Sequence, residues 1–333
     1  MLGSRHDITT IGSAVVDIFF YTEEGELIAN PKDLTKQKLL AFEFGAKIVS
    51  DQAYICLGGG ALNTATTFAQ LGLKATVLSS IGTDSMAEEI VRQMKVKKLG
   101  TTLMQHQMKL PTAISCIVSS QKRGEHVAFY YPGARSAITI NPKVLKNIKS
   151  DWIYLCSLSG SARCVASVQQ IIMHAAKNSI KLAWNPGADE LAAGWPKLKK
   201  LFPLVEVLSV NQDEAIQLVM SRGEQVKGLG ARGLIKKLHQ FGQNITVMTQ
   251  GAHGALVYDG HKLLFKSAPS VKAVNSTGAG DAFASAFVTG LIRFKGNLSR
   301  SLSLGIANSA SVVTHIGAQR GIMTQKDLAK SNI

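Results

Sequence analysis

The most informative segment lies near the C-terminus and reads Val274-Asn275-Ser276-Thr277-Gly278-Ala279-Gly280-Asp281. A mostly apolar stretch of helical length, residues 282–292, follows it directly. Two glycines before a helix let the backbone approach a ligand, and the free N–H groups of the first turn form an anion site. We expect a phosphate there, and Asp281, kept ionised by the helix end, as a proton acceptor. Taken alone, the motif would equally give a first-turn acid that only stabilises the helix.

A second glycine-rich segment reads Gly58-Gly59-Gly60-Ala61-Leu62-Asn63 and also precedes a helical pattern, which ends at Gly72. Three consecutive glycines exceed what a turn needs, and they suit a floor on which a polar ligand lies against backbone. Asp17 comes shortly after the first expected strand, at the end where open α/β sheets bind ligands. Its carboxylate can accept two hydroxyl hydrogen bonds.

Short β-branched runs alternate with helical patterns along most of the chain. This alternation predicts an α/β fold with a mostly parallel central sheet and helices on both faces. The expected strands are residues 7–12, 75–79, 152–155, 180–185, 205–210 and 245–249.

Two stretches, residues 19–56 and 112–131, break the alternation. Turn signals at Glu24-Gly25 and Arg123-Gly124 predict antiparallel ribbons. Neither ribbon could bury a core alone, so we expect them to form one small β lid. Residues 1–333 are then a single domain, and an uncovered lid edge could pair two copies in a homodimer.

The composition narrows the class of protein. With 46% hydrophobic and 18% charged residues the chain can bury a large core. No apolar run reaches the length of a membrane span and no signal peptide is evident, so we expect a cytoplasmic protein. The net charge of +15 would attract polyanions, but the basic residues are spread along the chain, which argues against a nucleic-acid partner.

The two glycine-rich segments, at opposite ends of the chain, resemble the signature segments of the ribokinase-like (PfkB) carbohydrate kinase family. The resemblance implies a ribokinase-like fold and ATP-dependent transfer of a phosphoryl group to a hydroxyl of a sugar or nucleoside. By it, Asp281 is the catalytic base and Gly278, Ala279 and Gly280 form the anion hole. The acceptor would be bound by Asp17, Gly59, Gly60 and Asn63.

Further segments match the family. Asn211 and Glu214 are similar to its N-x-x-E motif, which organises Mg²⁺ and the ATP phosphates, although this spacing is also that of a helix capping box. Thr249, Gly251 and Gly254 resemble its ATP-binding loop, and a tight hairpin is the plainer alternative. Asn308 would border adenine.

The resemblance also implies a monovalent cation site, of K⁺, formed mostly by backbone carbonyls. The matching positions are Asn275, Thr277, Val312, His315, Gly317 and Gly321. The family has Asp where this chain has Asn275, so we expect the affinity for K⁺ to be reduced.

Other classes are excluded or left open by the sequence. The P-loop motif G-x-x-x-x-G-K-[ST] is absent, and so is a G-x-G-x-x-G segment after the first expected strand. A catalytically silent protein of the same fold, with a regulatory or nucleic-acid-binding role, remains an alternative. The acceptor stays open among a hexose, a pentose and a nucleoside.

Overall fold

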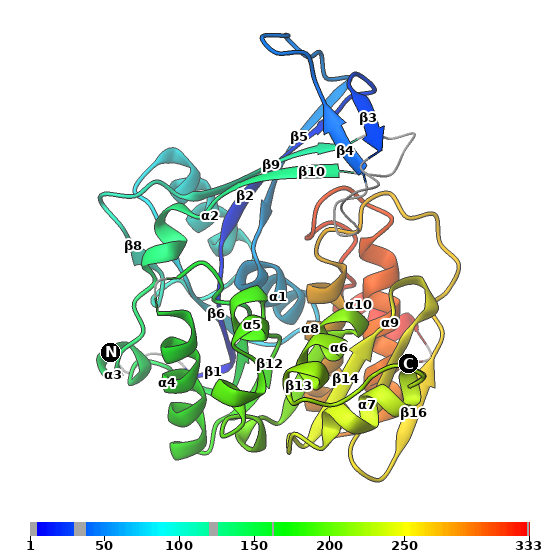
Figure 1. Cartoon of the computed structure of the whole chain (residues 1–333). Coiled ribbons are helices and arrows are strands. Elements are labelled where there is room, and N and C mark those ends of the chain that lie inside the picture. Colours follow the sequence, from blue (N-terminus) through cyan, green and yellow to red (C-terminus); the bar gives the residue numbers. More distant parts are fainter. Residues whose placement is uncertain (1–4, 30–37, 120–125, 162, 332) are drawn as a thin grey trace.

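The central element is an eight-stranded sheet with the order β16-β15-β14-β13-β12-β11-β1-β6 (Figure 1). The computed structural model describes the chain except residues 1–4, 30–37, 120–125, 162 and 332. All six strands predicted from the sequence are present and parallel: β1 (His6–Ile11), β6 (Ala75–Leu78), β11 (Ser150–Leu155), β12 (Lys181–Trp184), β13 (Val207–Asn211) and β14 (Ile245–Thr249). An antiparallel extension, β15 (Ala255–Tyr258) and β16 (Leu263–Lys266), completes one edge.

Helices cover both faces of this sheet, as predicted. Alternate side chains of β11 point to opposite faces, so Ile153 enters one core and Trp152 the other. The first core is covered by α4 (Cys164–Lys177), α5 (Ala188–Leu198), α6 (Gln212–Ser221) and α7 (Ala231–His239). The second is covered by α1 (Gly60–Gln70), α2 (Ser85–Val96), α8 (Ala279–Arg293) and α9 (Leu298–Val312).

Shorter elements connect these layers. They are β7 (Ser80–Ile81), β8 (Gln105–His106), α3 (Pro142–Leu145), α10 (Gln325–Lys330) and the 3₁₀ turns Gly133–Ala137, Phe202–Leu204 and Gly251–His253. In the part of the chain that the structure describes, no helix is both long and apolar enough to cross a membrane.

A second sheet projects over one end of the central sheet and forms the predicted lid (Figure 1). Its order is β10-β9-β2-β5, with β2 (Val15–Tyr21), β5 (Gln52–Gly58), β9 (Ala113–Ser119) and β10 (His126–Tyr131). The pairs β2–β5 and β9–β10 are antiparallel, but β2 and β9 run parallel, so the lid is a mixed sheet.

The lid also differs from the prediction in its limits. It starts at Val15 and includes Gly58, and the turn at Glu24-Gly25 does not join neighbouring strands. That turn leads into a separate ribbon of β3 (Glu26–Ala29) and β4 (Lys38–Ala41). The physical reason is that β2 pairs with β5 over seven residues, which leaves the intervening chain to pair with itself. The turn predicted at Arg123-Gly124 lies outside the described residues.

The two faces of the lid have different surroundings. On the inner face Phe19, Tyr21 and Ile117 are buried, and Ile316 from the loop after α9 packs against them. On the outer face, Ile55 is 72% exposed and Phe129 is 65% exposed. The inner face therefore already contacts the C-terminal part of the chain.

Candidate active site

The two glycine-rich segments meet beneath the lid, at the carboxyl ends of the parallel strands (Figure 1). Asp17 lies on β2 of the lid, and Asp281 lies in the first turn of α8. The sequence placed Asp17 in the connection after β1, but it is the third residue of β2. The two carboxylates are close enough for the charge of Asp281 to raise the pKa of Asp17.

Each glycine of the segment 58–60 leaves room for another part of the protein. A Cβ on Gly58 would lie 1.9 Å from Oδ2 of Asp17, and one on Gly59 would lie 2.5 Å from the carbonyl oxygen of Ser13. A Cβ on Gly60 would lie 3.0 Å from Cβ of Cys156 on the neighbouring strand end. Gly58 thus leaves room for the Asp17 carboxylate, a role that its place in the glycine run does not reveal.

Asp17 is 7% exposed, and burial followed by the charge of Asp281 raises its pKa to about 6. Cys56 of β5 and Ser115 of β9 stand directly beside it in register. The carboxylate therefore faces the space between the lid and the glycine floor, with a hydroxyl and a thiol as neighbours.

Asp281 is held by one side chain of α1. Nδ2 of Asn63 donates a hydrogen bond of 2.9 Å to Oδ2 of Asp281, while Oδ1 lies 3.6 Å from where a Cβ on Gly60 would stand. Burial raises the pKa of Asp281, and the bond from Asn63 opposes this. We expected the helix end to keep Asp281 ionised. Desolvation by burial outweighs the effects that favour the ionised form, so the pKa of Asp281 is raised. A raised pKa suits a group that must accept a proton.

The segment 278–280 places open backbone at the start of α8. Gly278 has φ 76° and packs so closely that a Cβ would lie 2.3 Å from Cβ of Ala318. No atom lies within 4 Å of the corresponding position at Gly280. Among the described residues, no acceptor takes the N–H groups of Gly280 and Asp281, whereas the N–H of Ala279 bonds to Ser276 at 3.2 Å. The N–H of Gly278 also has no acceptor among these residues, so the available donors are those of Gly278, Gly280 and Asp281. The anion hole of Gly278, Ala279 and Gly280 stays a prediction.

Asn211 and Glu214 form the capping box that the sequence left as an alternative. Oδ1 of Asn211 accepts from the backbone of Glu214 at 2.9 Å, and Oε2 of Glu214 accepts from the backbone of Asn211 at 2.8 Å. Burial raises the pKa of Glu214. The box starts α6 at the end of β13, at the same edge of the sheet as the aspartates. A role with Mg²⁺ stays a prediction.

The loop after β14 is the hairpin that the sequence offered as an alternative. Thr249 ends β14, and Gly254 has φ 115° with the backbone oxygen of Lys266 2.1 Å from its Cβ position. Gly251 has φ 56° and no atom within 4 Å of that position. The hairpin thus keeps one glycine exposed, and its contact with ATP stays a prediction.

Asn308 has a structural environment. It is 0% exposed, and its Nδ2 donates to the backbone oxygen of Ala282 at 2.8 Å while its Oδ1 accepts from Met323 at 2.8 Å. Both ends of the amide are therefore bonded inside the protein, and the contact of Asn308 with adenine stays a prediction.

The residues predicted to surround a monovalent cation lie in the loop before α8, at the end of α9 and in the loop that follows it. The backbone of Val274 and Asn275 donates to the oxygen of Val313 at 2.7 and 3.2 Å. Oδ1 of Asn275 already accepts from Thr277 at 2.9 Å, and the oxygen of Val312 accepts from His315 at 3.0 Å. The remaining predicted positions, Gly317 and Gly321, have φ 85° and 73° in the same loop.

No group of three or more His, Cys, Asp and Glu side chains that could hold a metal exists within the described part of the molecule. Mg²⁺ is commonly held by one or two carboxylates together with water and substrate phosphates, so this finding does not bear on whether Mg²⁺ binds here.

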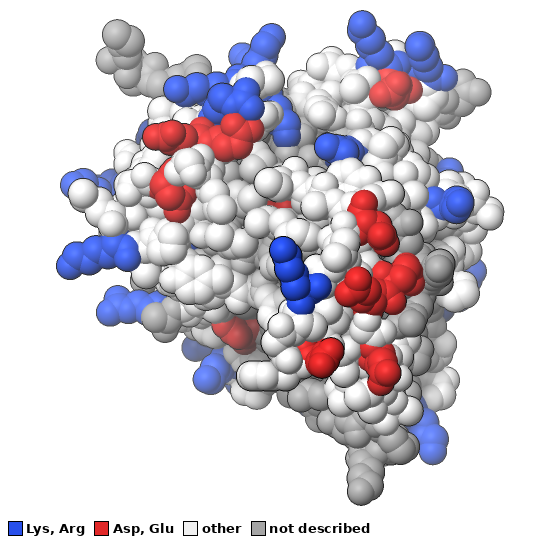
Figure 2. Space-filling model, turned by 90° about the horizontal axis from the view of Figure 1, so that it is seen from above, with Lys and Arg blue, Asp and Glu red and all other residues white. Residues whose placement is uncertain are grey.

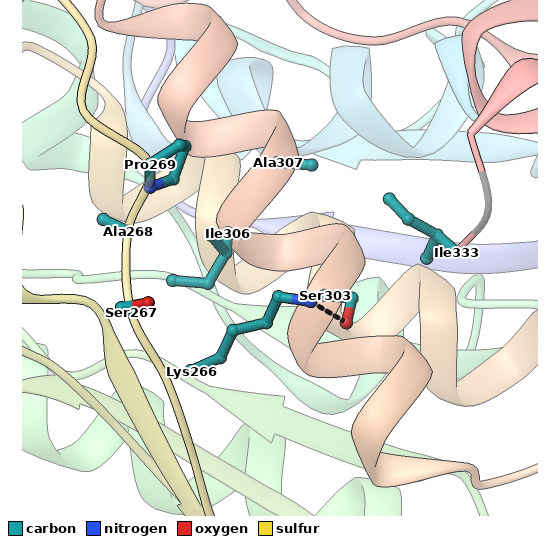
Figure 3. A pocket seen from close by; sticks show the side chains of 8 residues that line it. All are labelled: Lys266, Ser267, Ala268, Pro269, Ser303, Ile306, Ala307 and Ile333. Atoms are coloured by element: carbon teal, nitrogen blue, oxygen red, sulfur yellow. Dashed lines mark hydrogen bonds between the residues drawn. The ribbon is translucent and has the colours of Figure 1, made fainter.

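A pocket of about 340 Å³ lies away from the aspartates, between α9 and the segment after β16 (Figure 3). Ile306 and Ala307 line one side and Ala268 and Pro269 another, while Lys266 donates to Ser303 at 2.7 Å. It contains none of the predicted site residues.

The face seen from the lid side carries both signs of charge (Figure 2). Lys and Arg side chains stand singly or in small groups, and Asp and Glu side chains lie among them. On this face the positive charges do not merge into one continuous surface of the kind that a nucleic acid would require.

Two contributors to the site were missed. Ser13 accepts the backbone N–H of Gly60 through its hydroxyl at 3.0 Å and so fixes the glycine floor. Gln319 donates to Oδ1 of Asn63 at 3.0 Å. Neither has a motif of its own in the sequence, because each acts on a residue far away along the chain.

The fold matches those of solved ribokinase-like structures. The structure of Arabidopsis thaliana ribokinase complexed with ribose and ATP has a TM-score of 0.80 at 19% identity, covering 98% of both chains. A nucleoside kinase of Burkholderia thailandensis in complex with inosine has a TM-score of 0.76 at 18% identity, covering 96% of both.

The sequence comparisons agree with the fold. An ATP-dependent 6-phosphofructokinase of Thermoanaerobacterium thermosaccharolyticum is 23% identical over 94% of this chain and 90% of its own length. A ribokinase of Haemophilus influenzae is 25% identical over 85% of this chain and 89% of its own length. The model of the pfkB family carbohydrate kinases matches residues 46–325. The chain belongs to this family.

Proposed function

We propose that the protein is an ATP-dependent kinase that transfers the γ-phosphoryl group to a hydroxyl of a sugar or nucleoside. The observation that carries this proposal is the meeting of Asp17 and Asp281 over the glycine floor, beside the free N–H groups of Gly280 and Asp281. Phosphoryl transfer needs little besides positioning and charge stabilisation, and this arrangement offers both.

In the proposed reaction, Oδ1 of Asp281 accepts the proton of the acceptor hydroxyl. The acceptor oxygen bonds to the γ-phosphorus, the bond from that phosphorus to the bridging oxygen breaks, and ADP leaves. The N–H groups of Gly280 and Asp281 hold the charge on the transferring phosphoryl group. The raised pKa of Asp281, caused by burial, makes it a better acceptor for the proton than an ordinary carboxylate.

Acceptor recognition is assigned to Asp17 with the floor of Gly59 and Gly60. The Asp17 carboxylate can accept hydrogen bonds from two hydroxyls, which a sugar or ribose ring provides as neighbours. Asn63 is assigned first to the placement of Asp281, because its Nδ2 is already committed there. ATP binding is assigned to Thr249, Gly251 and Gly254, on the side of the Gly280 N–H that lies opposite the acceptor.

Mg²⁺ would be held through Glu214 and Asn211 together with the ATP phosphates and would neutralise phosphate charge. A strong dependence on K⁺ is not proposed, because Asn275 is neutral and its oxygen is bonded to Thr277. Residues 1–333 are proposed to act as one domain whose uncovered lid edge pairs two copies. Four free cysteines fit the reducing conditions of a cytoplasmic location.

The test is a screen for ATP-dependent phosphorylation of hexoses, pentoses and nucleosides, followed by Asp281→Asn with the best acceptor. We expect this substitution to lower kcat by about two to four orders of magnitude, the range for a lost general base. Binding of ATP, measured by calorimetry, should stay close to that of the wild type. Turnover of Asp281→Asn near the wild-type value would contradict the assignment. A wild type that phosphorylates none of these acceptors would instead favour the silent regulatory protein.

A further inference from the structure

A line of hydrogen bonds runs from Asp281 to the far end of α2. Asn63 of α1 donates to Asp281 at 2.9 Å, and Gln319 of the loop after α9 donates through Nε2 to Oδ1 of Asn63 at 3.0 Å. Lys97, the residue that follows α2, donates through Nζ to Oε1 of Gln319. The Thr66 hydroxyl of α1 lies 3.3 Å from the same oxygen, but its one hydrogen also has a nearer acceptor, the backbone oxygen of Leu62 at 2.8 Å. Four residues separated by up to 256 positions in sequence thus form one connected chain.

The two ends of this chain fix its direction. An ammonium group has only donors and an ionised carboxylate has only acceptors. With Lys97 at one end, Gln319 must turn its oxygen to Lys97 and its NH₂ to Asn63. Asn63 must then turn its oxygen to Gln319 and its NH₂ to Asp281. If the amide of Asn63 were reversed, its oxygen would face the Asp281 carboxylate, and the two acceptors would repel each other.

We propose that Lys97 and Gln319 are positioning residues for Asp281, which orient the Asn63 amide so that it donates to Oδ2 and leaves Oδ1 free toward the glycine floor. This rests on the proposed function of Asp281 as the base. Lys97 is a positioning residue, not a catalytic one, because Asn63 is the member of this line of hydrogen bonds that contacts the Asp281 carboxylate.

The partial burial of the Lys97 side chain indicates that it does more than keep the protein surface hydrated. Its neighbours Lys95 and Lys98 are exposed, whereas the side chain of Lys97 is partly buried and burial lowers its pKa. Among the ion pairs of the described residues, none involves Lys97. Partial burial of an ammonium group whose partner is a neutral amide has a desolvation cost that an exposed lysine avoids.

Several other groups face Asp281 and bear on its protonation. Asp17 of the lid lies close enough for their charges to interact, and Tyr154 of β11 and Cys156, the residue after β11, have their pKa values raised partly by the charge of Asp281. None of these groups belongs to the hydrogen-bonded chain. Changes at Lys97 should therefore reach Asp281 through Gln319 and Asn63, since the substitutions below leave the other groups in place.

The decisive experiment measures the protonation of Asp281 directly. In protein labelled with ¹³C at the aspartate carboxyl carbon, the Asp281 resonance is identified by its loss in Asp281→Asn, and its pKa is read from a pH titration. Lys97→Met keeps the length and apolar stem of the side chain but removes the donor. We expect the pKa of Asp281 to rise by about half a unit to one unit, because a hydrogen bond to the charged form is weakened.

Two controls separate orientation from charge. Lys95→Met removes the same charge from the exposed face of α2 and should leave the titration unchanged, and Lys97→Arg retains a donor and should stay near the wild type. Gln319→Leu should reproduce the rise while Lys97 is intact, and the double variant should show no further rise, because both changes break one chain. Thermal unfolding of each variant shows that it is folded.

Kinetics provide a second readout. In Lys97→Met the acidic limb of the kcat profile should move to higher pH with the titration, while KM for ATP stays unchanged. An unchanged Asp281 titration in Lys97→Met, or additive shifts in the double variant, would overturn the proposal. Because the titration needs no turnover, it remains decisive if the wild type phosphorylates no acceptor, and that result would count only against the kinase assignment.

Discussion

The two glycine-rich segments look alike in sequence, but they differ in what surrounds them. At residues 58–60 the space where each side chain would stand is filled by protein, namely Asp17, Ser13 and Cys156. At Gly280 that space is empty, although Gly278 two residues earlier packs tightly on Ala318. The first segment is therefore built to admit the protein's own groups, and the second leaves one glycine open to a ligand.

This difference separates two reasons for glycine that a sequence motif cannot distinguish. A glycine that packs against protein leaves room for a neighbouring side chain, so replacing it should first lower the stability of the fold. A glycine next to empty space and free N–H groups leaves room for a ligand to reach those groups, so replacing it should weaken ligand binding and leave the fold intact.

Among the substitutions that test this comparison, the largest expected effect is on activity and concerns Gly280→Ala. The methyl group meets no protein atom, and Ala favours a helix over Gly by up to about 1 kcal/mol, so stability should stay the same or rise. The methyl group would occupy the space proposed for the phosphoryl group, and kcat/KM for ATP should fall about 100-fold, as for a misplacement of roughly 1 Å.

Gly230→Ala is the control for activity, since Gly230 also has no atom within 4 Å of its Cβ position and is the N-cap residue of α7 with φ −65°. It should leave activity unchanged and lower stability slightly, because Ala is a poorer N-cap residue than Gly. Equal activity of Gly280→Ala and Gly230→Ala would show that the space at Gly280 is not used.

Gly58→Ala should behave in the opposite way. Its Cβ would overlap Oδ2 of Asp17 at 1.9 Å, so the carboxylate or the strand must move, at a cost of about 3 kcal/mol. Urea unfolding should show the loss, and calorimetry should show weaker binding of the acceptor with ATP binding preserved. An unchanged unfolding midpoint would break the contrast between the two segments.

The buried carboxylate next to Gly58 predicts how stability depends on pH. Because burial raises the pKa of Asp17 from 3.8 to about 6, its protonated form is favoured in the folded protein. Its contribution to stability is fully present below the unfolded pKa and is lost as the pH rises through about 6. The loss is at most about 3 kcal/mol for a shift of roughly two units.

Asp17→Asn should remove this dependence. The free energy of unfolding of the wild type should therefore fall relative to that of Asp17→Asn between pH 4 and pH 7, measured by urea titration. Asp51→Asn, which changes an exposed aspartate, is the control and should run parallel to the wild type. If the free energies of unfolding of Asp17→Asn and wild type change in parallel with pH, the pKa of Asp17 is not raised by folding.

The smallest expected effect concerns the loop next to the open segment. In Asn275→Asp the carboxylate can still accept the Thr277 N–H, so the turn is kept while a charge is added. Stimulation of activity by K⁺ over Na⁺ should increase about two- to fivefold, as expected for one partly exposed charge interaction. A steep, saturable response of the wild type to millimolar K⁺ would show that Asn275 does not limit cation binding.

Local patterns were sufficient for much of the fold. The six parallel strands were predictable because a strand buried on both faces is a short apolar run, whatever its partners. The start of α8 was predictable because glycine and helix periodicity act within one turn. The limits of the lid were not, since the pairing of β2 with β5 joins segments about 40 residues apart and competes with the nearer ribbon of β3 and β4.

By itself, the sequence determined the class of fold, the two glycine-rich helix starts and the candidate base Asp281, because backbone freedom and helix ends are local properties. Only the tertiary structure decided that Gly58 makes room for Asp17, that Asn308 is buried, and that Lys97 and Gln319 reach Asn63. The physical reason is that burial and hydrogen-bond direction depend on neighbours that the chain brings together only on folding. These neighbours set the pKa of a carboxylate and the orientation of an amide, and no spacing in the sequence records them.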